Sequence, residues 1–543
     1  MTRVLGVSPA HDSSICVIED GKLQFFSKEE RLSKRKRDKL PFLSLEGLDQ
    51  SSDIDYVAWV SPEKDDFTRD LFLEFIYKKV RHKEYLDLSD EHHLCHASLA
   101  FYNSGFKEAS VIVIDRNGSV IENSLRESES IFYAKYPCEF ESVYKSFWVF
   151  DNYGHEASEN YRRTFPNCEV VANSMFGVVK VYETATSLIS QDVLENGKVM
   201  GLSAYGSKYA TENIYNHSLN INDSLLAHEF NGKDRMAINT QIHSLKTDKV
   251  TKENFQVYAD YAYQVQHETQ QYVCSLIEKS LKKTGVKNIC ITGGYALNVV
   301  ANQFYVKNFP NVNFYFEPIP DDSGTSIGAA MLLYRTVTGD VEKHPLNNLF
   351  FNNKQHSLKD IRGKTITTRE VAKLMICDEK SVAIYSGVSE AGPRALGNRS
   401  ILFNASNKNG REIVNDIKKR EWYRPFAASV LEEDAQLIFE MLGLQSSPFM
   451  TINFQVKEDF ATKFPAITHV DGTSRIQTVS KDNRDLYSLL KEIKEITGYG
   501  ICLNTSFNLA GDPLVEFPED AISVLNNSSL DYVWFPEVQT LLS

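Results

Sequence analysis

Four segments in the C-terminal part of the chain carry residue types that bind anions. The densest is residues 391–400, AGPRALGNRS, with two arginines, two glycines and a proline. Glycine lets the backbone approach a ligand closely, and arginine offers a planar fork for phosphate or carboxylate. Residues 417–427, 468–475 and 503–508 add further cationic and hydroxyl side chains. Together these segments predict a site for more than one phosphate group.

A histidine pair is a candidate metal site. His92 and His96 lie four residues apart at the start of an expected helix that continues through residues 98–101, so both face one side of it. Two neutral imidazoles at this spacing can hold one divalent metal ion, whereas His93 points elsewhere. The alternative is a helix cap and a surface residue, and spacing alone does not separate the two.

Two short polar turns offer further candidates. Asp322 precedes an apparent helix at residues 325–330, so it is either a third metal ligand or an N-cap residue. His11 and Asp12 lie in the first expected hairpin. His11 could act as a general base toward a hydroxyl group, but a turn stabilised by the Asp12 side chain explains both residues without a function.

Composition is that of a globular protein. The 543 residues are 42% hydrophobic and 24% charged, enough for several hydrophobic cores. The eight cysteines are scattered without a CxxC pair, which disfavours a zinc ribbon or a redox motif. Neither a signal peptide nor a membrane-spanning segment is expected. The net charge of −13 argues against nonspecific nucleic-acid binding, although residues 34–39, KRKRDK, form a dense basic run.

The elements that must position these residues have an α/β pattern. Asp20-Gly21 marks a hairpin turn between two strands. One buried strand ends in the polar residue Asp115, and another leads into Gly293-Gly294, an arrangement common beside phosphate sites. The expected strands cover residues 3–7, 14–18, 23–26, 110–114 and 287–292.

A domain boundary is expected between residues 338 and 364. Regular periodicity is lost there, and the segment carries Gly339, Pro345 and paired asparagines. No internal repeat of solenoid period and no low-complexity tract interrupts the chain elsewhere.

Ordered motifs along nearly the whole chain resemble the NodU/CmcH carbamoyltransferase family. Besides the four C-terminal segments, these motifs are GVS at 6–8, HDSS at 11–14, EER at 29–31, HHLCHA at 92–97, GKVMGLSAYG at 197–206, GGYALN at 293–298 and DSG at 322–324. So many motifs in one order make the resemblance specific.

The resemblance implies two domains. Residues 1–350 would form an actin-like ATPase (ASKHA) domain, similar to the universal tRNA threonylcarbamoyl transferase. Residues 360–543 would form a YrdC-like α/β domain. In such enzymes the second domain makes carbamoyl adenylate from carbamoyl phosphate and ATP with Mg²⁺. The first domain then transfers the carbamoyl group to an acceptor hydroxyl, and AMP leaves.

The resemblance also implies roles for individual residues. His92, His96 and Asp322 would bind Fe(II) or another divalent metal that holds the adenylate phosphate, and His11 with Asp12 would supply a base. The remaining residues would bind carbamoyl phosphate and nucleotide: Arg394, Asn398, Arg399, Ser400, Lys418, Arg424, Arg475, Asn504 and Ser506 in the C-terminal domain, and Lys198, Gly201, Gly293, Gly294 and Asn298 in the N-terminal domain.

Four features depart from the family pattern. Ala391, Ala428 and Tyr295 replace the usual residues at their positions. Arg116 and Asn117 interrupt the usual Asp-Gly pair after the strand at residues 110–114. These changes leave the expected chemistry intact and could reshape the nucleotide pocket or the acceptor side.

The acceptor stays open at this point. An AT-rich-looking composition and the basic run at 34–39 suggest 5-hydroxymethylcytosine in DNA as the acceptor. The family carries a basic stretch at the same place, which weakens this argument. A DNA acceptor would also need its base exposed. A sugar, aminoglycoside or polyketide hydroxyl is the alternative. A tRNA threonylcarbamoyl transferase-like enzyme and a noncatalytic ATP-binding regulator are disfavoured by the complete set of motifs. The expected location is the cytoplasm, which would be that of the host if a phage encodes the protein. No membrane contact is expected. A homodimer is an open alternative.

Overall fold

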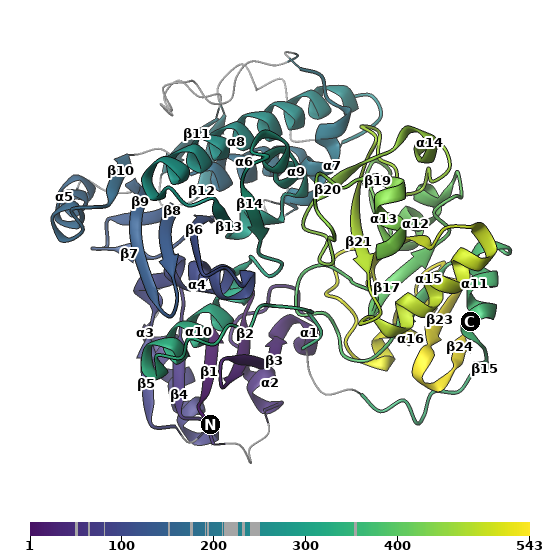
Figure 1. Cartoon of the computed structure of the whole chain (residues 1–543), viewed down its shortest axis with the longest axis horizontal. Coiled ribbons are helices and arrows are strands. Elements are labelled where there is room, and N and C mark those ends of the chain that lie inside the picture. Colours follow the sequence, from purple (N-terminus) through teal and green to yellow (C-terminus); the bar gives the residue numbers. More distant parts are fainter. Residues whose placement is uncertain are drawn as a thin grey trace. The chain divides into compact units, whose positions relative to one another are not determined.

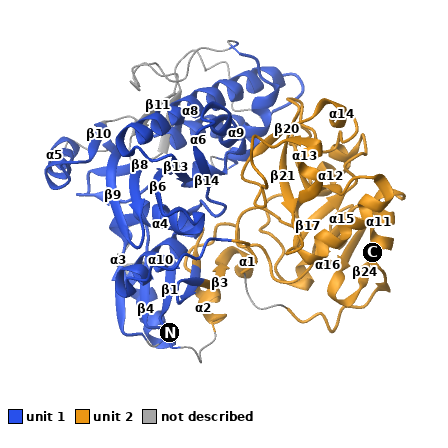
Figure 2. Cartoon of the chain, viewed as in Figure 1, with its two compact units in different colours: residues 1–10, 15–22, 49–346 blue, residues 11–14, 23–48, 347–543 orange. Residues whose placement is uncertain are grey.

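Contacts divide the chain into two α/β units (Figure 2). Unit 1 comprises residues 1–10, 15–22 and 49–346, and unit 2 comprises residues 11–14, 23–48 and 347–543 in the computed structural model. Segments 11–14 and 23–48 therefore belong with the C-terminal residues, whereas the sequence analysis assigned them to the N-terminal domain. The structure describes residues 1–48, 53–62, 66–80, 82–149, 153–173, 177–190, 192, 195–208, 210, 226–230, 234–238, 250–351 and 356–543.

Two larger sheets are built mainly from unit 1 (Figure 1). The first has the order β3-β2-β1-β4-β5, with β1 (Arg3–Ser8), β2 (Ser14–Glu19), β3 (Lys22–Lys28), β4 (Tyr56–Trp59) and β5 (Glu84–Asp87). The second has the order β10-β9-β8-β6-β13-β14, and a short strand pairs with β8. Its members are β6 (Glu108–Ile114), β7 (Val120–Ile121), β8 (Leu125–Lys135), β9 (Glu139–Val149), β10 (Glu169–Asn173), β13 (Asn288–Thr292) and β14 (Asn313–Phe316). A separate hairpin consists of β11 (Leu226–Phe230) and β12 (Asp234–Ile238).

Parallel pairing in the second sheet decides where the functional side chains meet. Strands β6, β13 and β14 run parallel, so their carboxyl ends lie at one edge. The helices of unit 1 are α3 (Asp66–Lys79), α4 (His92–Ser104), α5 (Gly154–Thr164), α6 (Val178–Ser190), α7 (Asn196–Leu202), α8 (Phe255–Thr284), α9 (Val299–Asn308) and α10 (Thr325–Thr338).

Unit 2 is organised around one ten-stranded sheet with the order β15-β24-β23-β16-β17-β22-β18-β21-β20-β19. Its strands are β15 (Lys364–Thr365), β16 (Val382–Tyr385), β17 (Arg399–Phe403), β18 (Ala427–Leu431), β19 (Phe439–Glu440), β20 (Asn453–Val456), β21 (Thr473–Val479), β22 (Ile501–Ser506), β23 (Tyr532–Phe535) and β24 (Thr540–Leu542). Its helices are α1 (Glu29–Ser33), α2 (Phe42–Glu46), α11 (Thr368–Ile376), α12 (Gly410–Lys418), α13 (Glu432–Ile438), α14 (Glu458–Ala461), α15 (Arg484–Thr497) and α16 (Pro518–Asn526).

The core of unit 2 follows from amphipathic helices on this sheet. Leu486, Leu489, Leu490 and Ile493 place one face of α15 in a buried cluster with residues of α11 and the sheet. Helix α11 begins at a capping box, in which the Thr367 side chain accepts from the Glu370 backbone.

The strands expected from the sequence are confirmed, with ends that shift by one or two residues. Asp20 and Gly21, between β2 and β3, have φ angles of 45° and 76°. Positive φ at both central residues is typical of a type I′ hairpin turn. Among the described residues between Thr338 and Lys364, no helix or strand forms, as the loss of periodicity predicted.

Glycines allow α10 to approach its neighbours very closely. A Cβ atom on Gly328 would lie 1.9 Å from the Cys95 carbonyl oxygen of α4, and one on Gly324 would lie 2.1 Å from the Ile319 carbonyl oxygen. Any larger side chain at these positions would force the backbones apart. The close approach sets the distance between α4 and the start of α10.

Gly328→Ala is therefore expected to destabilise unit 1 by at least about 1–3 kcal/mol, because overpacking displaces α10 from α4. Urea unfolding followed by circular dichroism measures this effect. Val337→Ala, at a position 39% exposed on the same helix, is the control and should have little effect. Equal stability of Gly328→Ala and the native chain would contradict the close packing of α4 on α10.

Candidate functional site

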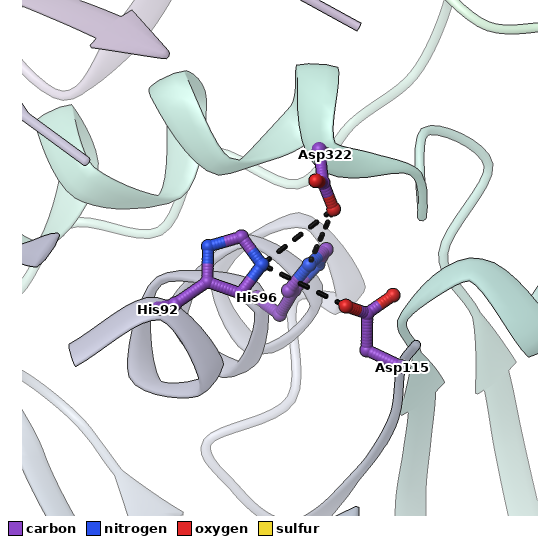
Figure 3. Close-up of side chains that lie close together, drawn as sticks. All are labelled: His92, His96, Asp115 and Asp322. Carbon is purple, nitrogen blue, oxygen red and sulfur yellow. Dashed lines mark ion pairs between the residues drawn. The ribbon is translucent and has the colours of Figure 1, made fainter. Parts of the chain in front are cut away.

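Four buried side chains of unit 1 converge on one point (Figure 3). His92, His96, Asp115 and Asp322 each offer one ligand atom, and these atoms lie within 4.8 Å of one another. The Asp322 Oδ1 atom is 3.5 Å from His92 Nε2 and 3.6 Å from His96 Nε2. Asp115 Oδ2 is 3.8 Å from His92 Nε2. Two imidazoles and two carboxylates thus form a compact cluster.

Three structural elements bring these residues together. His92 and His96 project from the first turns of α4, with the i, i+4 spacing that the sequence predicted. Asp115 follows the last residue of β6. Asp322 begins a short 3₁₀ turn before α10, and the neighbouring Asp321 takes the N-cap role by accepting from Ser323 N at 3.2 Å.

Asp115 was missed as a ligand in the sequence analysis. Its signal was a buried apolar strand that ends in a carboxylate, at the edge where parallel strands end. The structure also shows why this carboxylate is fixed. The Gly294 backbone N–H donates to Asp115 Oδ1 at 3.1 Å, and that of Asn117 donates to Oδ2 at 3.4 Å.

Burial and mutual charge dominate the electrostatics of the cluster. Burial alone would lower the pKa of His92, but the carboxylates of Asp115 and Asp322 outweigh it and raise that pKa to about 10. Burial and the Asp322 charge act to raise the pKa of Asp115, yet His92 and His96 hold it below its usual range. The Asp115 carboxylate therefore stays ionised beside the two histidines.

The donor set fits a divalent metal ion. Both ring nitrogens of His92 and of His96 are buried without a hydrogen-bond partner among the described residues. Metal–ligand bonds of about 2.0–2.2 Å place two ligands of one ion at most about 4.4 Å apart. The present 4.8 Å spread needs only a slight inward movement of the side chains. Imidazole and carboxylate ligands together suit iron and related divalent metals.

A buried ion pair lies next to the residues that position this cluster. Lys145 Nζ contacts Glu127, and although burial acts against it, this ammonium group lowers the pKa of Glu127 to about 2. Glu127 accepts from Ser119 N at 3.1 Å, and the Ser119 hydroxyl accepts from His92 N at 2.9 Å. The pair thereby holds the start of α4 against the segment that follows Asp115.

His93 is confirmed to point away from the cluster. Its Nδ1 atom lies 2.7 Å from the Ser130 hydroxyl, and burial lowers its pKa to about 3. It is therefore neutral and structural.

The predicted nucleotide residues of unit 1 have varied environments. Gly293 has a φ angle of 84°, and a Cβ there would lie 2.3 Å from the Ile114 carbonyl oxygen, so the Gly293-Gly294 turn packs against the end of β6. The Asn298 side chain caps α9 by accepting from Ala301 N, and it donates to Gln266 at 2.9 Å. Lys198 and Gly201 lie in α7. A nucleotide role for all five residues stays a prediction.

His11 and Asp12 belong to unit 2, with 37% of the His11 side chain exposed. The His11 Nε2 atom is 3.3 Å from Asp12 Oδ2, and the buried Lys28 ammonium group is 3.9 Å from Asp12 Oδ1. Such a carboxylate partner orients an imidazole. The role of His11 as a base stays a prediction.

Unit 2 contains a group of like charges. Burial and the nearby Arg394, Arg420 and Arg424 lower the pKa of Arg475 well below its usual value. Burial and the same Arg420 and Arg424 do so for Lys418. Arg424 pairs with Glu421 at 3.6 Å. Four of the predicted phosphate ligands therefore share one electrostatic environment, which a bound anion would stabilise. Arg420 belongs to it as well and was not among the predicted ligands.

Arg399 differs from these cations. Its guanidinium is fully buried, stacks on the Tyr385 ring at 3.6 Å, and donates to the carbonyl oxygens of Ser386 at 2.6 Å and Gly387 at 3.1 Å. These contacts fix the loop, and the role of Arg399 in phosphate binding stays a prediction. Asn398 and Ser400 act similarly, because Asn398 donates to Val388 O and Ser400 accepts from Gly397 N.

The last two predicted residues lie on β22. Ser506 accepts from Lys418 Nζ at 3.1 Å, so these two residues are in contact. Asn504 is buried and donates to the Ser429 hydroxyl at 2.8 Å and to Gln477 at 3.3 Å. Asn504 thus links three strands of the sheet.

Comparisons with known proteins identify the family of this chain. Residues 63–331 match the description "Carbamoyltransferase N-terminus", and residues 373–540 match "Carbamoyltransferase C-terminus". An uncharacterised protein of Methanocaldococcus jannaschii is 30% identical over 81% of this chain and 71% of its own length. Nodulation protein NolNO of Sinorhizobium fredii is 26% identical over 96% of this chain and 77% of its own length. The chain belongs to the carbamoyltransferase family of the NodU/CmcH type and is an O-carbamoyltransferase.

Likeness to solved structures is weaker. Full-length HypF in its phosphate- and nucleotide-bound form has 14% sequence identity and a TM-score of 0.38, over 63% of this chain and 56% of HypF. This likeness is too low to carry an argument. Within the described residues, no helix is both long and apolar enough to cross a membrane.

Asp115→Asn is expected to weaken binding of a divalent metal at least about 100-fold, because it removes a charged ligand that faces the two histidines. Calorimetric titration of the metal-free protein with Co²⁺ or Fe²⁺ measures the affinity. His155→Ala, at an exposed histidine of α5, is the matched control. Unchanged affinity in Asp115→Asn would exclude Asp115 as a ligand.

Glu317, just beyond β14, offers a pH test of the segment before Asp322. Burial raises its pKa to about 7, against hydrogen bonds from Ile319 N and Asn103. Because the folded pKa exceeds the unfolded one, stability should fall as the pH rises from about 4.5 to about 7, by at most about 1.4 kcal/mol per pH unit. Urea unfolding between pH 5 and pH 8 should show a shallower dependence in Glu317→Gln, and an identical dependence would refute the shift.

Proposed function

We propose that this enzyme transfers a carbamoyl group from carbamoyl phosphate to an acceptor hydroxyl through carbamoyl adenylate, with ATP consumed. The observation that carries the proposal is the buried cluster of His92, His96, Asp115 and Asp322, in a chain that matches the carbamoyltransferase family along both halves. The reaction also needs a site for substrates with several phosphate groups, and the cluster of cations in unit 2 supports such a site.

The proposed reaction balances in three steps. Carbamoyl phosphate and water give carbamate and phosphate. A carbamate oxygen then attacks the α-phosphorus of ATP, which gives carbamoyl adenylate and pyrophosphate. Finally, the acceptor oxygen attacks the carbamoyl carbon, the bond from that carbon to the AMP oxygen breaks, and the hydroxyl proton passes to a base. Carbamate decomposes in water, so sites that exclude water favour this sequence.

Unit 2 would carry out adenylation as a YrdC-like domain. Arg394, Arg424, Arg475 and Lys418 would neutralise the phosphoryl oxygens of ATP, which reaches the protein with Mg²⁺. The electrostatic crowding of these residues supports that assignment. Arg399, Asn398 and Ser400 would shape the loop around the same site.

Unit 1 would carry out transfer as an actin-like domain. His92, His96, Asp115 and Asp322 would hold a divalent ion, with iron as the leading candidate, that supplies Lewis acidity toward the adenylate phosphate. Gly294 and Asn117 would keep Asp115 in place through their backbone N–H groups. His11, oriented by Asp12, would accept the proton of the acceptor hydroxyl.

Two acceptors suit this chemistry: the hydroxymethyl group of 5-hydroxymethylcytosine in DNA and a hydroxyl of a small molecule such as a sugar. The basic run at 34–39 was one reason to consider DNA. Lys34 forms an ion pair with Asp520 and lies over the Phe517 ring at 4.5 Å, so part of this run binds unit 2 itself. That contact leaves less free positive charge for DNA.

The test separates the two half-reactions. The enzyme with ferrous iron is incubated with carbamoyl phosphate and ATP, beside DNA containing 5-hydroxymethylcytosine and a panel of sugars and aminoglycosides. Mass spectrometry of the acceptors should reveal a gain of one carbamoyl group. His96→Ala should keep pyrophosphate release but lower transfer at least about 100-fold, whereas Arg394→Ala should lower pyrophosphate release by a similar factor.

Several outcomes would contradict parts of this proposal. Transfer that proceeds without ATP would exclude the adenylate. Normal pyrophosphate release in Arg394→Ala would remove that residue from the adenylation site. A requirement for threonine and bicarbonate in place of carbamoyl phosphate would indicate threonylcarbamoyl chemistry. Activity on free sugars that is insensitive to salt would exclude DNA as the required acceptor.

A further inference from the structure

Arg31 is a buried arginine that has no role in either of the two proposed half-reactions. It lies in the short helix α1, and only 2% of its surface is exposed. Helix α1 belongs to unit 2, although the chain reaches it more than 300 residues before the rest of that unit. A buried guanidinium has to be satisfied by nearby groups, because burying an unpaired charge is costly.

Contacts of Arg31 satisfy only part of its guanidinium. The Nη2 atom donates to the Gly392 carbonyl oxygen at 3.2 Å. The Nε atom lies 3.7 Å from Glu30 Oε1, which is beyond hydrogen-bond distance. Within the part of the chain that the structure describes, neither Nε nor Nη1 has a hydrogen-bond acceptor. Two donor groups of a buried cation are therefore left for a further partner.

The acidic groups near Arg31 act on it through charge and accept no hydrogen bond from its Nε or Nη1 atom. Glu30 is shared, since its Oε1 atom is also 3.9 Å from the Lys28 ammonium group. Burial raises the pKa of Glu30, but Lys28 and Arg31 outweigh this and keep the pKa below its usual value. Lys28 has a second carboxylate, Asp12, at 3.9 Å, and the Arg31 charge also acts on the buried Glu516, yet neither provides a hydrogen-bond acceptor for Arg31 Nε or Nη1.

The contact with Gly392 places the Arg31 guanidinium beside the 391–394 loop, which is predicted to bind anions. Gly392 lies two residues before Arg394, whose charge acts on Arg475. The carbonyl group that Arg31 holds is thus part of the AGPR segment. A substrate phosphate bound by this loop would lie within reach of a guanidinium that still has donors to offer.

We propose that Arg31 is a phosphate-binding residue of unit 2, which donates from its guanidinium to a phosphate group of a substrate held at the 391–394 loop. The proposal rests on the proposed adenylation function. The phosphate belongs to carbamoyl phosphate or to ATP, and the measurements below distinguish the two. Arginine suits this role because it keeps its charge when buried and serves the loop carbonyl and the anion with different nitrogens.

A purely structural role is the competing explanation. In that case Arg31 would only hold Gly392, and its loss would loosen the loop for both substrates equally. A direct contact instead affects the substrate whose phosphate it binds. The ratio of the two KM values therefore separates the explanations, and the thermal stability of each variant reports on loosening.

The experiment compares Arg31→Gln and Arg31→Lys with Arg35→Gln in the full chain. Arg35 lies in the same basic run and is exposed, so it serves as the control. Initial rates of pyrophosphate release are measured while carbamoyl phosphate and ATP are varied separately. Arg31→Gln should raise the KM of one of the two substrates about 10- to 100-fold, Arg31→Lys should raise it less, and Arg35→Gln should leave both unchanged.

A second measurement does not depend on turnover. Thermal unfolding of each protein is followed with and without inorganic phosphate, carbamoyl phosphate or ATP. One of these probes should stabilise the native protein and Arg35→Gln, and should stabilise Arg31→Gln much less. Equal stabilisation of Arg31→Gln and the native protein would overturn the proposal, as would KM values that both rise by the same factor.

The two proposals fail in distinguishable ways. A native enzyme that releases no pyrophosphate would refute the proposed adenylation, yet phosphate-dependent stabilisation that is lost in Arg31→Gln would still support the binding role. Pyrophosphate release by the native enzyme with unchanged KM values in both Arg31 variants would refute the binding role alone.

Discussion

The structure of unit 1 depends on compensating the free-energy cost of burying two carboxylates. Asp115 and Asp322 both face His92 from less than 4 Å, and all of these groups are buried. Taking an ion out of water costs several kcal/mol unless a counter-charge is close. Two carboxylates match the charge of one divalent cation, and binding of such an ion would require both imidazoles to be neutral. The close approach at Gly328, the Gly294 N–H group and the Glu127–Lys145 pair all keep this arrangement rigid.

Unit 2 has the opposite electrostatic problem. Arg475 and Lys418 lie among other cations, so unit 2 contains a cluster of positive charge, whereas unit 1 contains buried carboxylates. Arg399 lies outside this cluster of cations. Its guanidinium donates to backbone carbonyl groups and stacks on the Tyr385 ring. A negatively charged protein can thus present a local site for phosphates, and net charge alone is a poor guide to its ligands.

The sequence predicted local features well and long-range ones poorly. Helical spacing was enough to place His92 and His96 on one face, and the Asp20-Gly21 turn follows from local backbone preference. Asp115 was missed as a candidate ligand because its position depends on the parallel pairing of β6 with β13, in which Ser110 pairs with Ile289 and so joins residues far apart in the sequence. The two roles of arginine in the 391–400 loop depend on which neighbours surround each guanidinium, and residue type does not reveal them. The assignment of segments 11–14 and 23–48 to unit 2 lies beyond any local pattern for the same reason.

The discontinuous chain path of unit 2 has a consequence for the order of events during synthesis. Residues 23–48 leave the ribosome early, but the sheet that they accompany begins only after residue 347. At about 5–20 residues per second, roughly 15–60 s separate the two. During that interval Arg31 and its neighbours lack the loop that they contact in the finished protein. Translation of the last third of the chain therefore determines when the N-terminal segment reaches its final environment, and a fragment that begins at residue 360 would be made without it.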